Sequence, residues 1–93
     1  MKEIYNQIDN LKNDLIDLSI EIHSNPEIKW KEFKAVKNIE NLLNKYKVKI
    51  NKVKDLPTAF TASIKGNSKG PVIALLAEYD ALPGIGHACG HNL

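Results

Sequence analysis

The feature that most constrains the fold of this 93-residue chain is an unbroken apolar run from Val72 to Ala77. A continuous run of this length, without alternating polar residues, is typical of a strand that is covered on both faces. The cover has to come from other elements of a chain that is long enough for at most one domain. The run therefore favours an α/β fold with helices packed against a buried sheet.

Two helical patterns precede this run. Between Ile4 and Ile22 the apolar residues recur at intervals of four and three, which predicts one long amphipathic helix. Asn25-Pro26 should end that helix, because a residue before proline is pushed out of the α region. A second helix is predicted from about Lys31 to Tyr46. Its inward side chains are expected to be Phe33, Val36, Ile39, Leu42, Leu43 and Tyr46.

Alternating sequences between the second helix and the apolar run predict two more strands. Residues 48–50 and residues 60–64 alternate between apolar and polar side chains, which is the period of a strand with one solvated face. Asp55-Leu56-Pro57 predicts a turn between them, and residues 66–70 form a loop of turn-favouring residues. The expected fold class is α/β, with two N-terminal helices followed by three strands of a mixed sheet.

The segment after the apolar run gathers residue types that bind metal ions. It contains the only cysteine, Cys89, and two of the three histidines, His87 and His91, together with three of the five glycines. Thiolate and imidazole suit zinc, and also manganese, iron or cobalt where carboxylates complete the shell. In an extended backbone the spacing i, i+2, i+4 would place all three side chains on one face. Their combination favours a metal site over three unrelated side chains.

Two carboxylates lie close to these residues in the sequence. Glu78 and Asp80 follow the apolar run at its carboxyl end, where ligands gather in open α/β sheets. The chain contains no second Cys/His pair of the kind that closes a zinc-finger site, so an open site completed by other residues is expected. A buried structural thiol, a nucleophile paired with a nearby histidine and a redox-active thiol are the alternatives for Cys89.

Composition argues against nucleic acid and membrane partners. The net charge is only +2, and the chain has no arginine, the residue that makes bidentate base contacts. No stretch approaches the roughly 18 apolar residues of a membrane span, and the N-terminus has no apolar signal sequence. A single cysteine cannot form an internal disulfide. We expect a cytoplasmic protein with a small-molecule partner.

The sequence from Ala77 to Leu93 resembles the first metal motif of peptidase family M-twenty, and more narrowly its amidohydrolase branch. That branch includes p-aminobenzoyl-glutamate hydrolases, auxin-conjugate hydrolases, N-acyl-amino-acid hydrolases and aminoacylase-like dipeptidases. The resemblance is carried by Cys89-Gly90-His91 with Asp80-Ala81-Leu82-Pro83 upstream. His23-Ser24-Asn25-Pro26-Glu27 is similar to the His-x-x-Pro-Glu opening of the family, and the resemblance covers nearly the whole chain.

The resemblance implies a di-metal catalytic domain of the aminopeptidase and carboxypeptidase kind. Residues 1–93 would be the N-terminal part of that metallohydrolase domain, truncated before its lid or dimerisation domain. Cys89 and His91 would be metal ligands, and Asp80 would be a catalytic residue that orients a ligand. The family's usual histidine two residues before that aspartate is replaced here by Glu78, and Asn92 stands where many relatives have aspartate.

The resemblance implies a parent hydrolase that uses two divalent ions, zinc or manganese. Its expected reaction is cleavage of the amide bond between an acyl or aminoacyl group and an amino acid, with an N-acyl amino acid or a dipeptide as substrate. A homodimer is compatible with the resemblance for the full-length enzyme. The family's Glu-Glu pair, which supplies the general base, and its later histidine ligands have no counterpart in this sequence. We therefore expect the isolated chain to be inactive, and the alternatives are a non-catalytic remnant or metal-binding module and a thiol sensor.

Overall fold

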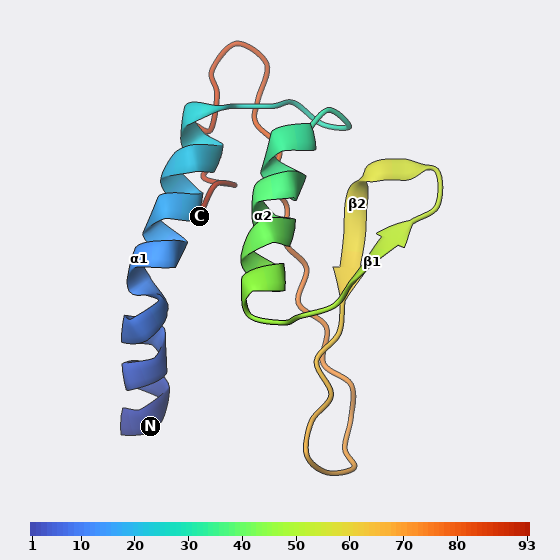
Figure 1. Ribbon diagram of the computed structural model, residues 1–93. Coiled ribbons are helices and arrows are strands. Elements are labelled where there is room, and N and C mark those ends of the chain that lie inside the picture. The colour runs from blue at the N-terminus through green and yellow to red at the C-terminus, as the bar shows by residue number, and fades with distance from the viewer.

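The computed structural model describes all 93 residues and contains two helices and two strands. Their order is α1 (Lys2–Ser24), α2 (Phe33–Lys45), β1 (Ile50–Val53) and β2 (Leu56–Ala62). The two helices lie side by side, and the hairpin of β1 and β2 lies next to α2 (Figure 1). The predicted order of these four elements is therefore confirmed.

Helix α1 ends where the sequence predicts. Its last residue is Ser24, and the side-chain amide of Asn25 donates a hydrogen bond to the Glu21 carbonyl oxygen at 3.0 Å. Pro26 then prevents the helix from continuing. Within the apolar stripe Ile22, near this end, is buried, and Leu11 and Leu18 are half-buried. Neither helix combines the length and the apolar character that crossing a membrane requires.

Helix α2 is shorter than predicted, and its buried residues lie near its N-terminus. Ala35 and Val36 are buried, whereas Phe33 and Tyr46 are 55% and 44% exposed. The prediction that these two aromatic side chains point inward is wrong, since both are exposed at the ends of the helix, where the Tyr46 hydroxyl still donates to the Asp14 carboxylate of α1 at 2.5 Å. The end of α2 is instead tied to α1 by Lys45, whose ammonium group lies 2.8 Å from the Asp14 carboxylate.

Strands β1 and β2 form an antiparallel hairpin. Ile50 pairs with Ala62, and the register becomes irregular between Lys52 and Val53. The turn contains Asp55, whose positive φ of 65° is a conformation that aspartate tolerates better than most residues. The predicted turn at residues 55–57 is thus displaced, since Leu56 and Pro57 already belong to β2.

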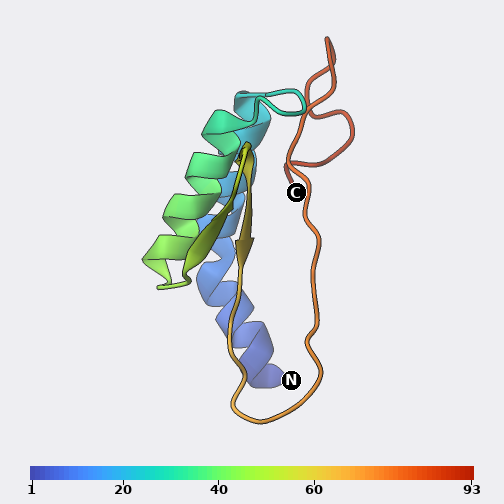
Figure 2. The ribbon, with the colours of Figure 1, turned by 90° about the vertical axis from the view of Figure 1, so that its right-hand side faces the viewer.

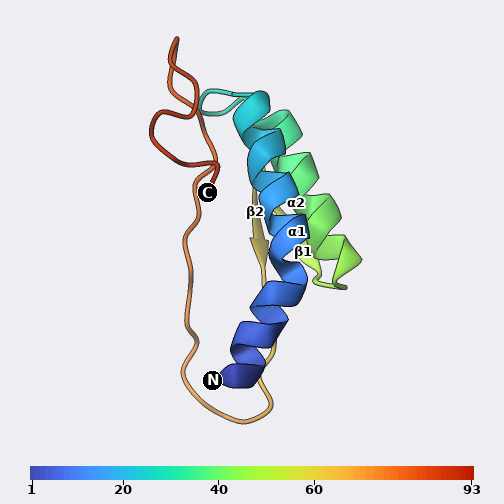
Figure 3. The same cartoon turned by 90° about the vertical axis from the view of Figure 1, so that its left-hand side faces the viewer.

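The predicted third strand is absent, and the mixed sheet of the sequence-based prediction is wrong. Residues 72–77 form no strand, and Val72, Leu75 and Leu76 are 94–97% exposed. A buried strand needs hydrogen-bonded neighbours at its edges and cover on its faces. No backbone–backbone hydrogen bond involves residues 63–77, and all of these residues are exposed, so this segment has neither. Figures 2 and 3 show it running separately along one side of the helices and hairpin.

The core is small and reaches the segment after the apolar run at one point. Seven of 93 residues are buried, so most contacts are made within a thin layer. Ala81 is one of the four buried apolar residues and forms a parallel bridge with Ile28, in the connection between α1 and α2. The connection between the helices therefore positions the residues on either side of Ala81.

Candidate metal centre

The segment from Glu78 to Leu93, here called the metal loop, folds back on itself after Ala81. The amide of Leu82 donates to the Gly86 carbonyl oxygen at 2.9 Å, which closes a tight antiparallel bridge. Gly86 and Gly90 have φ values of 63° and 83°, a region that glycine enters without steric cost. The reversal returns the end of the loop to its beginning, so that residues 78–80 and residue 91 meet.

Glu78, Asp80 and His91 form a cluster at this meeting point. The Nδ1 atom of His91 lies 2.8 Å from Asp80 Oδ1, and its Nε2 atom lies 3.2 Å from Glu78 Oε2. One potential ligand atom from each of the three residues lies within 4.8 Å of the others. The sequence predicted these three residues near one another, and the structure brings them together.

The two carboxylates change the acid–base behaviour of His91. The hydrogen bond to Asp80 is the main cause that raises the pKa of His91 above its ordinary value. The negative charges of Asp80 and Glu78 act in the same direction, whereas burial of the ring opposes them. His91 is therefore a more basic imidazole than an isolated one, and a basic imidazole is a stronger metal ligand.

Cys89 lies beside this cluster and outside it. Its thiol is exposed and donates a long hydrogen bond, 3.7 Å, to the Asp80 carbonyl oxygen. His91 Nδ1 lies 3.2 Å from the same oxygen, so Cys89 and His91 approach one backbone group. The Asp80 carbonyl is thus the point around which the two predicted ligands are arranged.

His87 occupies a different environment from the other two members of the predicted ligand triplet. It is buried, its two ring nitrogens have no hydrogen-bond partner, and its ring lies 6.3 Å from that of His23. Burial lowers the pKa of His87, and the charges of His23 and His91 lower it further, while Asp80 opposes them. The expectation that residues 87, 89 and 91 share one face is wrong, because this part of the loop is a series of turns.

Comparisons with known proteins show which proteins this chain resembles. The chain is 31% identical over 99% of its length to thermostable carboxypeptidase 2 of Saccharolobus solfataricus. It is 36% identical over 84% of its length to N-acetylcysteine deacetylase of Bacillus subtilis. It is also 35% identical over its whole length to one of the subunits of p-aminobenzoyl-glutamate hydrolase of Escherichia coli. No family model matches the chain.

This chain belongs to the M-twenty family of amidohydrolases and carboxypeptidases. It covers 27%, 24% and 24% of the lengths of these three relatives, which is about a quarter of each. The part of the family that this chain represents consists of two helices, a β-hairpin and the metal loop.

The donors of this family member fit a divalent cation. Carboxylate oxygens and an imidazole nitrogen are ligands that zinc and manganese accept, and a thiolate favours zinc. Asp80 binds one ring nitrogen of His91, which fixes the tautomer and leaves the other nitrogen, beside Glu78, for a metal ion. The residues present can therefore hold the ion that the family implies.

Two contacts that hold the metal loop were not identified from the sequence. The Glu27 carbonyl oxygen accepts a hydrogen bond from the Ala81 amide at 2.7 Å, and the side-chain amide of Asn92 donates to Ser19 Oγ at 3.1 Å. Both join residues more than 50 positions apart, which no local pattern predicts. The one available signal for Glu27 was its place in the His-x-x-Pro-Glu motif.

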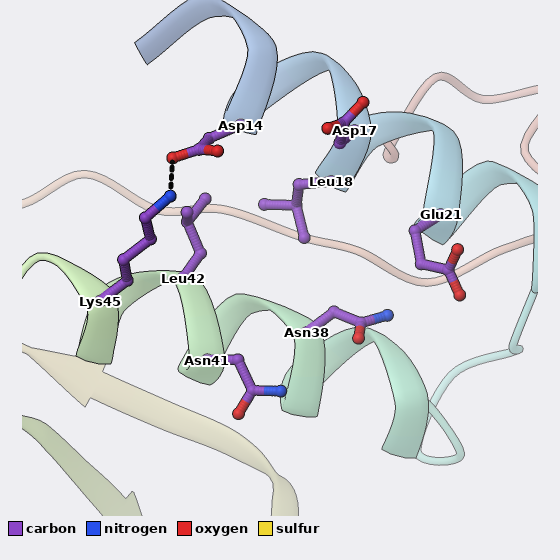
Figure 4. Close-up of a pocket in the computed structure, with 8 residues that line it drawn as sticks. All are labelled: Asp14, Asp17, Leu18, Glu21, Asn38, Asn41, Leu42 and Lys45. Carbon is purple, nitrogen blue, oxygen red and sulfur yellow. Dashed lines mark hydrogen bonds and ion pairs between the residues drawn. The ribbon is translucent and has the colours of Figure 1, made fainter.

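A groove between α1 and α2 is separate from the metal loop. It encloses about 400 Å³, and Leu18 and Leu42 face each other within it (Figure 4). The remaining lining residues are polar: Asp14, Asp17, Glu21, Asn38, Asn41 and Lys45. Because it shares no residue with the cluster of Glu78, Asp80 and His91, the groove has no part in the candidate metal centre.

Proposed function

We propose that residues 1–93 form the N-terminal part of a catalytic domain that hydrolyses amides with the help of divalent metal ions. The observation that carries this proposal is the cluster of Glu78, Asp80 and His91 in a chain of the M-twenty family. The relatives include enzymes named as a carboxypeptidase, two N-acetylcysteine deacetylases and an Xaa-Arg dipeptidase. These names support an amide bond between an acyl or aminoacyl group and an amino acid as the bond that is cleaved.

In this proposal Cys89 and His91 bind the metal, and Asp80 orients His91. The complete enzyme would use two ions, zinc or manganese, act on an N-acyl amino acid or a dipeptide, and be compatible with a homodimer. When bound, the metal would polarise the scissile carbonyl group and lower the pKa of a bound water. The parts that the chain itself supplies are the ligands, their orientation and their charge.

The residues of the cluster and the neighbouring Cys89 would have separate tasks in binding. Asp80 Oδ1 accepts a hydrogen bond from His91 Nδ1–H, so that the lone pair lies on Nε2. Glu78 places a second negative charge beside Nε2, which attracts a cation to that nitrogen. Cys89 has to lose its proton to bind, and its exposed position at the Asp80 carbonyl leaves the thiol accessible to an incoming ion.

A metal-binding module without hydrolytic activity is the second candidate function. The structure contains one cluster of three potential ligands, whereas two-metal hydrolysis needs donors for a second ion. The Glu-Glu pair that supplies the general base in the family also has no counterpart in these residues. We therefore propose that the 93-residue chain alone binds an ion and does not turn over an amide.

Calorimetric titration of the chain with Zn²⁺ and Co²⁺ tests the proposed function. We expect one ion per chain and about a 100-fold loss of affinity in His91→Ala, the upper part of the range for disturbing metal-site residues. His23→Ala is the matched control, because His23 is an exposed histidine outside the cluster, and its affinity should match that of the wild type. Absence of binding by the wild type, or equal loss in both variants, would contradict a metal site at His91.

A further inference from the structure

We infer that Glu27 is a positioning residue of the metal centre, which it connects to the N-terminus of α2. This inference rests on the proposed function, since it concerns the metal site assigned there. Glu27 lies in the connection between the helices, 51 positions before Glu78, and is not itself close enough to join the ligand cluster. Its role follows from two sets of hydrogen bonds that meet at this one residue.

The side chain of Glu27 caps helix α2. Its Oε2 accepts a hydrogen bond from the Lys34 amide at 3.0 Å, and its Oε1 accepts one from the Ala35 amide at 2.8 Å. The residue that directly precedes the helix, Glu32, provides no side-chain cap. The first amides of a helix lack intrahelical acceptors and carry partial positive charge, so a carboxylate with both oxygens engaged there is firmly held.

The backbone of Glu27 holds the metal loop. Its carbonyl oxygen accepts the Ala81 amide at 2.7 Å, and the parallel bridge between Ile28 and Ala81 continues the same contact. Ala81 is 2% exposed, so this hydrogen bond is shielded from water. A shielded bond of this kind is costly to break without a replacement partner.

This hydrogen bond determines where the Asp80 carbonyl points. The peptide between Asp80 and Ala81 is planar and trans, so its N–H and C=O groups point in opposite directions. With the N–H directed at the Glu27 carbonyl oxygen, the C=O is directed away from Glu27. On that side it meets Cys89 Sγ at 3.7 Å and His91 Nδ1 at 3.2 Å. Fixing one peptide plane thus arranges both proposed ligands.

The contact between Asn92 and α1 does not orient the Asp80 carbonyl. Asn92 binds Ser19 in the C-terminal part of α1, and this contact holds the end of the loop after His91. It does not involve the Asp80–Ala81 peptide. Glu27 therefore links α2, through its side chain, to the Asp80–Ala81 peptide, through its backbone.

The test compares Glu27→Ala and Glu27→Gln with the wild type in a Co²⁺ titration of the 93-residue chain. The readouts are the dissociation constant and the intensity of the thiolate-to-cobalt absorption, which reports ligation by Cys89. We expect about tenfold weaker binding and a reduced thiolate band for Glu27→Ala, the size typical of disturbing residues behind metal ligands. Glu27→Gln keeps one acceptor oxygen and should lie between Glu27→Ala and the wild type.

Asp14→Asn separates positioning from stability. It weakens the contact of α1 with Lys45 and Tyr46, whose distances to Asp14 are 2.8 and 2.5 Å, and it lies away from the metal loop. It should lower the urea midpoint and leave the cobalt affinity within twofold of the wild type. The titrations are made where circular dichroism shows the same helix content in all chains. Should Glu27→Ala not reach that content, Glu27→Gln decides.

The outcomes distinguish this inference from the proposed function on which it rests. Cobalt binding by the wild type with unchanged affinity and thiolate band in the folded Glu27 variants would overturn the positioning role and leave the metal site intact. An equal loss of cobalt affinity in Asp14→Asn would also overturn the positioning role, because general destabilisation of the fold would then be sufficient to explain the weaker binding. No cobalt binding by the wild type would overturn both proposals together.

Discussion

Residues 72–77 and the metal loop are adjacent in the chain, yet they are held in opposite ways. The apolar run makes no backbone hydrogen bond outside the helices and strands, and Val72 and Leu75 are 97% and 95% exposed. The metal loop is joined to the helices at Ala81 and Asn92 and closes on itself at Gly86. In this chain the candidate metal centre is therefore held by α1 and by the connection between the two helices, and the apolar run makes no contribution to it.

The comparison also shows that an apolar sequence does not by itself lead to burial. Hydrophobic side chains favour burial, at about 25 cal/mol per Å² of apolar surface removed from water, but burial requires a surface to pack against. The metal loop is the more polar of the two segments, and it obtains its place from specific hydrogen bonds. An ordered site can thus lie next to a segment whose apolar side chains are fully exposed.

The largest effect is expected from making the apolar run polar. Four neighbouring exposed apolar side chains form an aggregation-prone surface, so the wild-type chain should self-associate. Leu75→Lys with Leu76→Lys should weaken self-association by at least about tenfold, as measured by sedimentation velocity, since burying one leucine is worth roughly 1.5–3 kcal/mol. The free energy of unfolding should change by less than about 0.5 kcal/mol, the usual effect of exposed substitutions.

Ile85→Lys is the control for that experiment. Ile85 is a 64% exposed apolar residue of the metal loop, so it tests whether any exposed side chain has the same effect. Its self-association should stay close to that of the wild type. If both variants reduce self-association equally, the apolar run is not the specific surface of self-association. The apolar run and the metal loop would then not differ in this property.

The sequence predicted the elements whose causes are local. The 3–4 spacing from Ile4 to Ile22, the stop at Pro26 and the alternation in residues 60–64 each depend on neighbours within a few positions. Helix α1 follows the first two, and β2 follows the third as far as Ala62. The strand at Val72 failed because its cause is not local: a sheet partner and covering layers have to exist elsewhere in the chain.

The candidate site was predictable in its residue types and less so in its arrangement. Carboxylates and histidines were expected together, and Glu78, Asp80 and His91 do meet. The differing environments of His87 and Cys89 depend on turns and on contacts with α1, and spacing along the chain does not encode these. The metal-binding roles of Cys89 and His91 stay predictions.

A smaller effect is expected from loosening the end of the metal loop. Asn92→Ala removes the hydrogen bond to Ser19 Oγ at 3.1 Å, and a partly buried hydrogen bond contributes about 1 kcal/mol. Urea unfolding followed by circular dichroism should show a loss of that size. Asn67→Ala is the control, since Asn67 is exposed and makes no side-chain hydrogen bond, and it should leave the urea midpoint unchanged. Equal midpoints for the two variants would show that the anchor at Ser19 does not hold the loop.

The smallest effect, and the one that examines the metal loop most closely, is the titration of its two histidines. The pKa of His91 is raised above 6.5, chiefly by its hydrogen bond to Asp80, and the pKa of His87 is lowered below 6.5, chiefly by burial. His91 therefore stabilises the fold fully below its unfolded pKa and loses this contribution as the pH rises through its raised folded value. His87 behaves in the opposite sense: its contribution is present above its unfolded pKa and is lost as the pH falls through its lowered folded value.

Nuclear magnetic resonance titration of the ring protons measures both values in one experiment. His91 should titrate at the higher pH, and Asp80→Asn should lower its pKa, because that variant removes the largest cause of the shift. Glu21→Gln is a suitable control, since the Glu21 carboxylate bonds Asn25 and touches neither histidine. A His91 that titrates below His87, or that is unmoved in Asp80→Asn, would mean that the carboxylates do not surround its ring in solution. The loop would then lack the preorganised imidazole on which metal binding through His91 depends.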